Sequence, residues 1–279
     1  MDLWYTRNES QNTKWSVRVT RPLFSIEGKS GRVDVLETED FGRILSVGGC
    51  LAITEGEGFV QREMLVHVPL NAHPGIRAVL VVGGRDLGAV LELLRYSQIE
   101  RIVLVENDQV LLDAQRKFFP NLAEILTDPR VRVADEDPED FVRESKDRFD
   151  LAIAQSGSAG EGALGQSFYC DCFRLLSGDG ILIAPAGSAY YATQRRELVS
   201  QAGKLKRLFP LYRLYHVDSP AIEGGSRLIG FASKKYDPVK DYDSSRWAKR
   251  DLPSRYYNAD VHKAAFALSP YIAEAIEGC

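Results

Sequence analysis

The sequence predicts an α/β protein with a doubly wound, mostly parallel sheet that follows a small antiparallel β-domain. From residue 77 onward, short apolar segments alternate with longer amphipathic ones, which is the rhythm of βαβ units. The first 55 residues instead alternate polar and apolar side chains over short runs, which is typical of antiparallel strands. We therefore expect a β-domain over residues 1–55 and an α/β domain over residues 56–279.

The elements of the β-domain are short and punctuated by glycine. Period-two alternation predicts strands at 15–19, 32–38, 43–47 and 51–54. Gly28, Gly31, Gly48 and Gly49 mark the turns between them. A helical pattern over about residues 59–73 then leads into the α/β domain.

The α/β domain contains five buried strands in its expected parallel part. These strands are predicted at 78–82, 102–105, 131–133, 151–154 and 181–184, with helices near 88–96, 109–118, 138–145, 166–176 and 190–208. The sheet is expected to close with two antiparallel strands at 212–217 and 226–232. Two helices, near 259–267 and 269–277, are predicted after them. In such a sheet, ligands bind beyond the carboxyl ends of the strands.

Composition argues against several classes of partner. The net charge is −4 and no block of Lys and Arg occurs, so no nucleic-acid partner is expected. No stretch approaches the ~20 apolar residues of a membrane span, and the first residues carry no secretory signal, so we expect no membrane partner. The spacing of the four cysteines predicts reduced thiols in a cytoplasmic protein. Four scattered histidines make a metal site unexpected.

A glycine-rich turn after the first parallel strand predicts a nucleoside site. Gly83, Gly84 and Gly88 allow close approach of the backbone to a ligand at a helix N-terminus, and Asp86 lies between them. Glu106 ends the next strand about 20 residues later, where it could accept both hydrogen bonds of a ribose diol. Asp137 follows the third strand and could receive an adenine amino group. The alternative is that Glu106 and Asp137 merely cap their helices.

Widely spaced segments show that the sequence resembles the spermidine synthase (polyamine aminopropyltransferase) family. They are LWYT at 3–6, VLETEDFGR at 35–43, REMLVHVPL at 62–70, DPRV at 128–131, RYYN at 255–258 and HKAAF at 262–266. The resemblance implies a methyltransferase-like Rossmann domain behind a small N-terminal β-domain. It also implies a homodimer or homotetramer without a permanently bound cofactor, which takes decarboxylated S-adenosylmethionine as co-substrate.

The family's chemistry needs carboxylates. An aminopropyl group passes from decarboxylated S-adenosylmethionine to putrescine, so two cationic substrates leave water and the attacking nitrogen must lose a proton. The resemblance places the family's two aspartates after the fourth parallel strand at Gln155 and Ser158. An amide cannot act as a base, so no residue is assigned as catalytic.

Other departures fall in the same pocket. Ala52 replaces a glutamine and Gly58 a glutamate, Gln61 and Arg62 replace a Tyr-His pair, and residues 185–188 read PAGS in place of Gln-x-Glu-Ser. Arg85 stands where the family has glycine, and Pro138 removes a backbone N–H beside Asp137. The expected substrate pocket therefore contains Gln61, Arg62, Arg85, Gln155 and Ser158, beside a glycine-rich loop over residues 156–165.

Three hypotheses follow. In the first, putrescine aminopropyl transfer is lost and the chain acts as a partner of an active paralogous subunit. In the second, the chain is a transferase with changed substrates, in which Arg62 and Arg85 pair with a carboxylate and S-adenosylmethionine or another anion binds. In the third, the chain is an active aminopropyltransferase, and Asp135, Glu136, Glu139 and Asp140 supply the missing charge. The neutral pocket favours lost or altered transfer.

Overall fold

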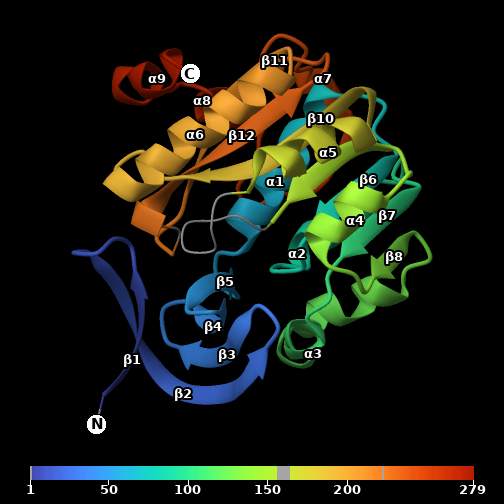
Figure 1. Ribbon diagram of the computed structural model, residues 1–279. Coiled ribbons are helices and arrows are strands. Elements are labelled where there is room, and N and C mark those ends of the chain that lie inside the picture. The colour runs from blue at the N-terminus through green and yellow to red at the C-terminus, as the bar shows by residue number, and fades with distance from the viewer. Residues whose placement is uncertain (1, 156–163, 222) are drawn as a thin grey trace.

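The computed structural model describes residues 2–155, 164–221 and 223–279. Within these residues the strands form a five-stranded sheet and a seven-stranded sheet. The five-stranded sheet, blue in Figure 1, lies below the α/β part. Ser158 and most of the predicted loop over 156–165 lie outside the described residues.

The N-terminal sheet is an antiparallel meander in chain order. Its strands are β1 (Leu3–Asn8), β2 (Lys14–Gly28), β3 (Gly31–Thr38), β4 (Gly42–Val47) and β5 (Cys50–Thr54). The sequence predicted the last three strands and the first part of β2, but missed β1 and residues 20–28. The latter side chains are largely exposed, and the register with β3 shifts on both sides of Pro22, so no clean alternation marks them.

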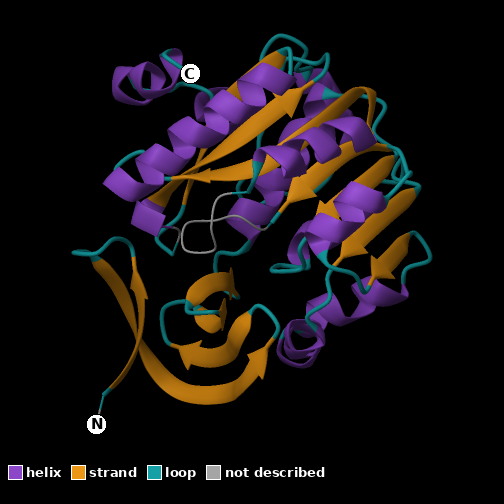
Figure 2. Ribbon diagram, in the orientation of Figure 1, coloured by secondary structure: helices purple, strands orange, loops and turns teal. Residues whose placement is uncertain are grey.

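The large sheet confirms the predicted doubly wound fold (Figure 2). Its strands are β6 (Ala78–Val82), β7 (Arg101–Val105), β8 (Val131–Ala134), β9 (Phe149–Ala154), β10 (Leu176–Gly187), β11 (Leu211–Asp218) and β12 (Ser226–Ser233). The order is β11-β12-β10-β9-β6-β7-β8, parallel from β10 to β8, with β12 antiparallel to both neighbours. The order reverses between β6 and β9, which is where such sheets bind ligands.

The helices cover both faces of this sheet. They are α1 (Phe59–Ala72), α2 (Gly88–Leu94), α3 (Gln109–Phe118), α4 (Pro138–Glu144), α5 (Gln166–Leu175), α6 (Ala192–Leu208), α7 (Ser244–Arg250), α8 (Ala259–Ala265) and α9 (Pro270–Glu277). Two 3₁₀ helices, η1 (Pro120–Thr127) and η2 (Glu223–Gly225), complete the set. The sequence missed η1, η2 and α7; α7 buries none of its residues and so carries no apolar stripe.

Alternate side chains of each strand enter two different cores. Val79 and Val81 of β6 pack in a core with α1, α2 and α3, which also includes side chains of the N-terminal sheet. Leu80 and Val82 pack in a second core with α4 and α5. Burial on both faces explains why the parallel strands read as continuous apolar runs.

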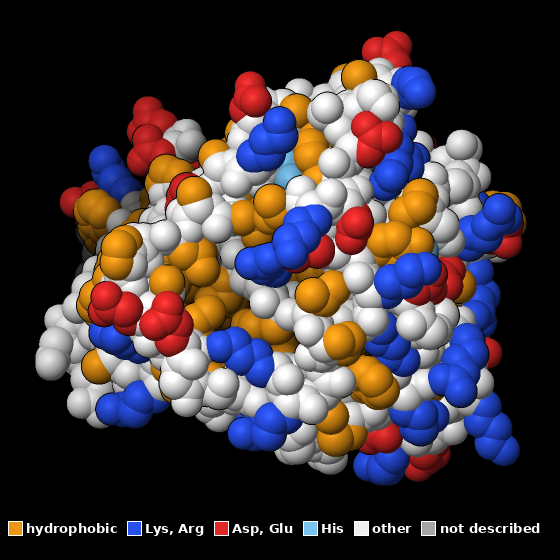
Figure 3. All heavy atoms as spheres, turned by 90° about the horizontal axis from the view of Figure 1, so that it is seen from above, with side chains coloured by type: hydrophobic (Ala, Val, Ile, Leu, Met, Phe, Trp, Pro, Cys, Tyr) orange, Lys and Arg blue, Asp and Glu red, His pale blue; other side chains and the backbone are white. Residues whose placement is uncertain are grey.

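The described part of the chain contains no helix that is both long and apolar enough to cross a membrane. On the face shown in Figure 3, acidic and basic side chains are interspersed. The predicted boundary after residue 55 falls between β5 and α1, and it stays a prediction.

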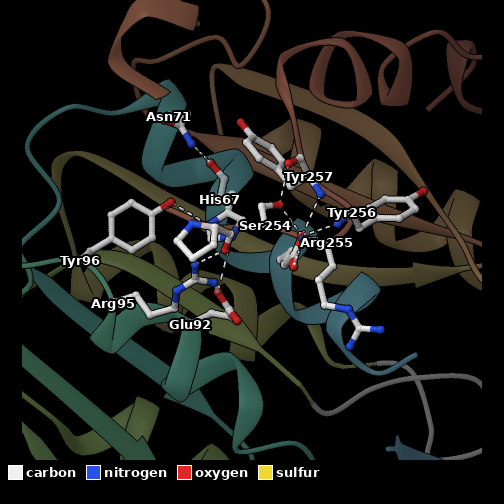
Figure 4. Close-up of polar contacts among 11 residues, drawn as sticks. His67, Asn71, Glu92, Arg95, Tyr96, Ser254, Arg255, Tyr256 and Tyr257 are labelled. Atoms are coloured by element: carbon white, nitrogen blue, oxygen red, sulfur yellow. Dashed lines mark hydrogen bonds and ion pairs between the residues drawn. The ribbon is translucent and has the colours of Figure 1, made fainter. Parts of the chain in front are cut away.

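A buried carboxylate ties the C-terminal segment to α1. Glu63, 2% exposed, accepts hydrogen bonds from the Ser254 hydroxyl (2.7 Å) and from the backbone N–H groups of Arg255 (3.0 Å), Tyr256 (2.9 Å) and Tyr257 (2.8 Å). Figure 4 shows residues 254–257 gathered beside this helix. Burial by itself would raise the pKa of Glu63, but the hydrogen bonds, led by that from Tyr257, outweigh it and lower the pKa.

Two histidines are buried near this segment. In His67, Nδ1 lies 2.6 Å from the Tyr96 hydroxyl, and Nε2 lies 3.5 Å from a carboxylate oxygen of Glu92 (Figure 4). His262 contacts the Tyr257 hydroxyl through Nδ1 (2.7 Å) and the Pro238 carbonyl through Nε2 (2.8 Å). Burial lowers the pKa of His67 from 6.5 to about 3 and that of His262 to about 4. Both imidazoles are therefore neutral at pH 7.

These lowered pKa values predict destabilisation in mild acid. Below the unfolded-state pKa of 6.5 the unfolded chain binds a proton at each histidine and the folded chain does not. Each histidine therefore removes about 1.4 kcal/mol of unfolding free energy per pH unit as pH falls from about 6 to about 4.5. Urea unfolding over this range measures the slope. In a His67→Gln variant the dependence of the unfolding free energy on pH should decrease by about 1.4 kcal/mol per pH unit. An unchanged dependence would contradict the lowered pKa of His67.

Candidate active site

The glycine-rich turn between β6 and α2 lies at the carboxyl end of the sheet. Gly83 has φ +86°, a conformation that side chains disfavour, and its N–H donates to the Val105 carbonyl (2.9 Å). The N–H of Gly84 donates to Glu106 Oε2 (2.7 Å). A Cβ on Gly84 would lie 2.9 Å from Glu106 Cγ, so the turn and the carboxylate meet because residue 84 has no side chain.

Two buried amides brace the same turn from opposite sides. Gln115 of α3 accepts from the Leu87 N–H (2.9 Å) and donates to the Gly84 carbonyl (2.6 Å). Gln155, directly after β9, accepts from the Asp86 N–H (2.9 Å) and donates to the Asp86 carbonyl (2.9 Å). An amide can do both, whereas a carboxylate could only accept. The structure thus gives Gln155 a positioning contact with Asp86; its predicted contact with substrate stays a prediction.

Sequence reasoning missed Gln115, although a signal was present. It lies one turn after Leu111 on the buried face of α3, and it is fully buried. A polar residue on the apolar stripe of a helix needs a hydrogen-bond partner, and a glutamine there points to a backbone segment that lacks one.

A cavity of about 820 Å³ opens beside the turn. This volume suits a nucleoside-sized ligand. The cavity is lined by Lys29, Ser30, Val47, Gly48, Cys50, Val82, Arg85, Glu106, Asn107, Leu111, Asp137, Pro138, Glu139, Asp140, Arg143, Leu164 and Phe168. The predicted nucleoside residues Glu106 and Asp137 therefore line one cavity, with Arg85 beside them.

The capping alternative holds for one of the two acids. Asp137 Oδ1 accepts from the N–H groups of Glu139 (2.9 Å) and Asp140 (3.1 Å) and so caps α4. Glu106 does not cap α3; Asp108 does, by accepting from the Leu111 N–H. Glu106 uses Oε2 for Gly84 and Oε1 for the Asp108 N–H (2.8 Å). Each carboxylate oxygen accepts about two hydrogen bonds, so Glu106 retains capacity for a diol.

Asp108 also connects the two sheets. Its buried carboxylate accepts from the Ser30 N–H (2.9 Å), and a Cβ on Gly28 would lie 2.5 Å from one of its oxygens. The contact holds the β2–β3 hairpin over the cavity, where Lys29 and Ser30 form part of its wall.

A second pocket, of about 40 Å³, contains Asp86 of the same turn in its wall. It is lined by Arg7, Leu51, Ala52, Ile53, Thr54, Glu57, Gly58, Gln61, Asp86, Ser219, Ala221 and Arg227. Arg62 is not among these lining residues, but its Nε donates to Asp86 Oδ2 (2.6 Å), while Asp86 Oδ1 accepts from the Gly88 N–H (2.8 Å). The structure thus brings Gln61, Arg62, Asp86 and Gly88 together.

The acids proposed as substitutes are divided between the cavity and solvent. Glu139 and Asp140 line the large cavity and Asp135 and Glu136 line neither pocket, although all four side chains are exposed. Among the described residues, no group of three or more His, Cys, Asp or Glu side chains could hold a metal ion.

Known proteins resemble this chain over its length. A family model, the spermine/spermidine synthase domain, matches residues 58–243. Polyamine aminopropyltransferases of Alkaliphilus metalliredigens and Clostridium beijerinckii are 39% and 38% identical to it, over 99% and 100% of this chain and 99% of each relative. A crystal structure of spermidine synthase in complex with the transition-state analogue AdoDATO superposes with TM-score 0.93 at 29% identity, covering 99% of this chain and 96% of the other. The spermidine synthase of Thermotoga maritima gives TM-score 0.91, also at 29% identity, covering 99% and 95%.

The contact between Gly84 and Glu106 predicts the effect of a single methyl group. Gly84→Ala would force Glu106 away from the turn, so the affinity for 5′-methylthioadenosine should fall by about tenfold or more. Isothermal titration calorimetry measures this affinity. Gly178→Ala is the matched control, because a Cβ on Gly178 meets no atom within 4 Å. Equal affinities for the two variants would contradict the placement of the ligand beside Glu106.

Proposed function

We propose that this chain, which belongs to the spermine/spermidine synthase family, is an active aminopropyltransferase that takes decarboxylated S-adenosylmethionine as donor and an amine as acceptor. The observation that carries the proposal is the cavity lined by Glu106 and Asp137 at the carboxyl ends of the parallel strands. Arg85 of the neighbouring turn also lines this cavity, and Asp86, the next residue, lines the second pocket. The activity of the full-length relatives supports the same conclusion.

These findings favour an active enzyme over the expectation that transfer is lost. That expectation rested on the neutral residues at family acidic positions, and Gln155 was prominent among them. In the structure Gln155 binds the backbone of Asp86, and two carboxylates, Asp86 and Glu57, still line the small pocket. The charge of the pocket is therefore altered but not absent, and an amine acceptor remains compatible with it.

The proposed reaction is a single displacement. The acceptor nitrogen forms a bond to the donor methylene carbon, the bond from that carbon to the sulfonium sulfur breaks, and its electron pair goes to sulfur. The products are a neutral thioether nucleoside and an extended amine, and one proton is released to solvent. Glu106 would hold the ribose and Asp137 the adenine, and holding both reactants in line lowers the entropic part of the barrier.

Asp86, which lines the small pocket, is the carboxylate that would face the reacting groups. Its backbone is held by Gln155 and its carboxylate by Gly88 and Arg62, so it cannot swing away from the reaction centre. A fixed carboxylate here would stabilise the positive charge of the substrates during transfer. The predicted homodimer or homotetramer, and pairing with a paralogous subunit, remain proposals.

A Glu106→Gln variant tests the assigned donor site. An amide at this position would lose a charge-assisted bond to the ribose, so donor affinity should fall by about 10- to 100-fold. Glu136→Gln is the matched control, because Glu136 is exposed and does not line either pocket. Calorimetry with methylthioadenosine measures binding, and mass spectrometry of methylthioadenosine released with decarboxylated S-adenosylmethionine and a panel of amines measures turnover.

The same measurements separate the hypotheses. Release of methylthioadenosine with an aminopropylated product supports the proposed activity. Tight nucleoside binding without turnover of any amine would contradict the proposed activity. That result would favour the hypothesis that the chain is an inactive partner of an active subunit. Stronger binding and turnover of S-adenosylmethionine than of its decarboxylated form would instead favour a transferase with a changed donor.

A further inference from the structure

The turn between β11 and β12 supplies part of the wall of the small pocket. Ser219 and Ala221 of this turn line the pocket and are 6% and 5% exposed. Residues 51–54 of β5 line it as well, together with Glu57 and Asp86. The pocket is thus built from segments that lie far apart in the sequence, and its size depends on how these segments are held together.

A buried ion pair near the N-terminus holds the β11–β12 turn. Arg7 of β1 and Glu9, just after this strand, are 4% and 6% exposed. Arg7 donates to Glu9 Oε1 from Nε (2.8 Å) and from Nη2, and its Nη1 donates to the Ala221 carbonyl (2.8 Å). The other carboxylate oxygen of Glu9 accepts from the Gly224 N–H (2.9 Å). One ion pair therefore binds two backbone groups of the turn.

Glu57 completes the attachment of Ala221. Its Oε1 accepts from the Ala221 N–H (2.8 Å), so the N–H and the carbonyl of this residue are both bonded to charged side chains from the first 57 residues. Hydrogen bonds to charged groups are stronger than those between neutral groups. The turn can move away from the pocket only if such bonds break.

The ion pair is itself held in place. The planar guanidinium of Arg7 can bind a carboxylate and a carbonyl at the same time, and its centre lies 5.2 Å from the centre of the Trp15 ring. Gln194 of α6 donates to the Glu9 carbonyl (3.3 Å) and accepts from the Ser188 N–H (3.0 Å). Because a buried carboxylate without a partner is costly, Glu9 in turn requires the charge of Arg7.

The volume of the small pocket limits what can enter it. Its volume is about 40 Å³, and a water molecule needs roughly 10–15 Å³ of cavity. The pocket therefore has room for an amino group and the first carbons of an unbranched chain. A methyl group on the same nitrogen would need further space, and one extra carbon in a closed pocket typically changes selectivity by about 10- to 200-fold.

We propose that Arg7 and Glu9 are positioning residues that fix the β11–β12 turn and thereby restrict the acceptor to an unsubstituted primary amine at its reacting end. The inference rests on the proposed transferase function and names what sets its acceptor specificity. The pocket receives the reacting end, and the rest of the acceptor lies outside it. The reaction is the displacement given above, in which nitrogen binds the donor carbon, sulfur leaves with the electron pair and one proton goes to solvent.

A lysine in place of Arg7 tests the proposal. Arg7→Lys keeps the positive charge that Glu9 needs, but an ammonium lacks the planar fork that binds Glu9 and the Ala221 carbonyl together. With decarboxylated S-adenosylmethionine as donor, kcat and KM are measured for putrescine and for N,N′-dimethylputrescine, which carry the same charge. Wild-type protein should prefer putrescine by about tenfold or more in kcat/KM. Arg7→Lys should reduce this preference by about tenfold, mainly through KM.

Arg18→Lys is the matched control, because Arg18 lies in the same sheet with a side chain that is 66% exposed. It should leave the preference unchanged. Hydrogen exchange of the Ala221 and Gly224 amides measures the attachment of the turn directly, and exchange should be about tenfold faster in Arg7→Lys. Titration of both amines into protein saturated with methylthioadenosine measures selectivity without turnover. Nucleoside affinity should not change, since neither Arg7 nor Glu9 lines the nucleoside cavity.

The outcomes separate a positioning role from a purely structural one. Equal use of the two amines by the wild-type protein would overturn the proposal, as would an unchanged preference or unchanged amide exchange in Arg7→Lys. A variant that loses nucleoside affinity and kcat for both amines alike would show a structural role only and would also overturn it. If wild-type protein turns over no amine, the proposed function fails. The binding preference then still decides the role of Arg7, and absence of binding by both amines would count against it.

Discussion

The site depends on how the sharp turn between β6 and α2 satisfies its buried backbone groups. N–H and carbonyl groups in such a turn cannot all pair with one another, and leaving them unpaired away from water costs free energy. Glu106, Gln115 and Gln155 supply the partners from three different elements. The turn, the ends of β7 and β9 and helix α3 are consequently held as one unit, and both pockets take their shape from it.

This unit explains how one chain can combine a retained cavity with an altered one. Glu106, one of the groups that hold the turn, also lines the nucleoside cavity, so a substitution there would disturb folding and binding together. The small pocket is lined by Arg7, Glu57, Asp86 and Arg227 among others, and none of the three side chains that hold the turn lines it. Its electrostatics could therefore change without disturbing the scaffold. The Arg62–Asp86 ion pair is one such change in electrostatics, because the guanidinium balances the charge of the Asp86 carboxylate.

The part of the candidate site that depends on local sequence and on strand order could be predicted from the sequence. Gly83, Gly84 and Glu106 follow adjacent parallel strands, and the carboxyl ends of such strands meet at one edge of the sheet. The contacts of Gln115, Asp108 and Gln155 were not predictable in the same way. Each joins groups that are 28 to 78 residues apart, and a hydrogen bond across that distance exists only after the layers have packed.

The sequence by itself determined the fold class, most of the strands and helices, and the nucleoside edge of the sheet. These follow from periodicity, glycine positions and strand order, which are local or nearly local properties. Tertiary structure decided what the substituted residues do. Whether Gln155 faces substrate or the backbone, and whether Arg62 binds a ligand or Asp86, depends on the distances between side chains from different elements. Hydrogen bonds and ion pairs weaken over a few ångströms, so packing alone decides them.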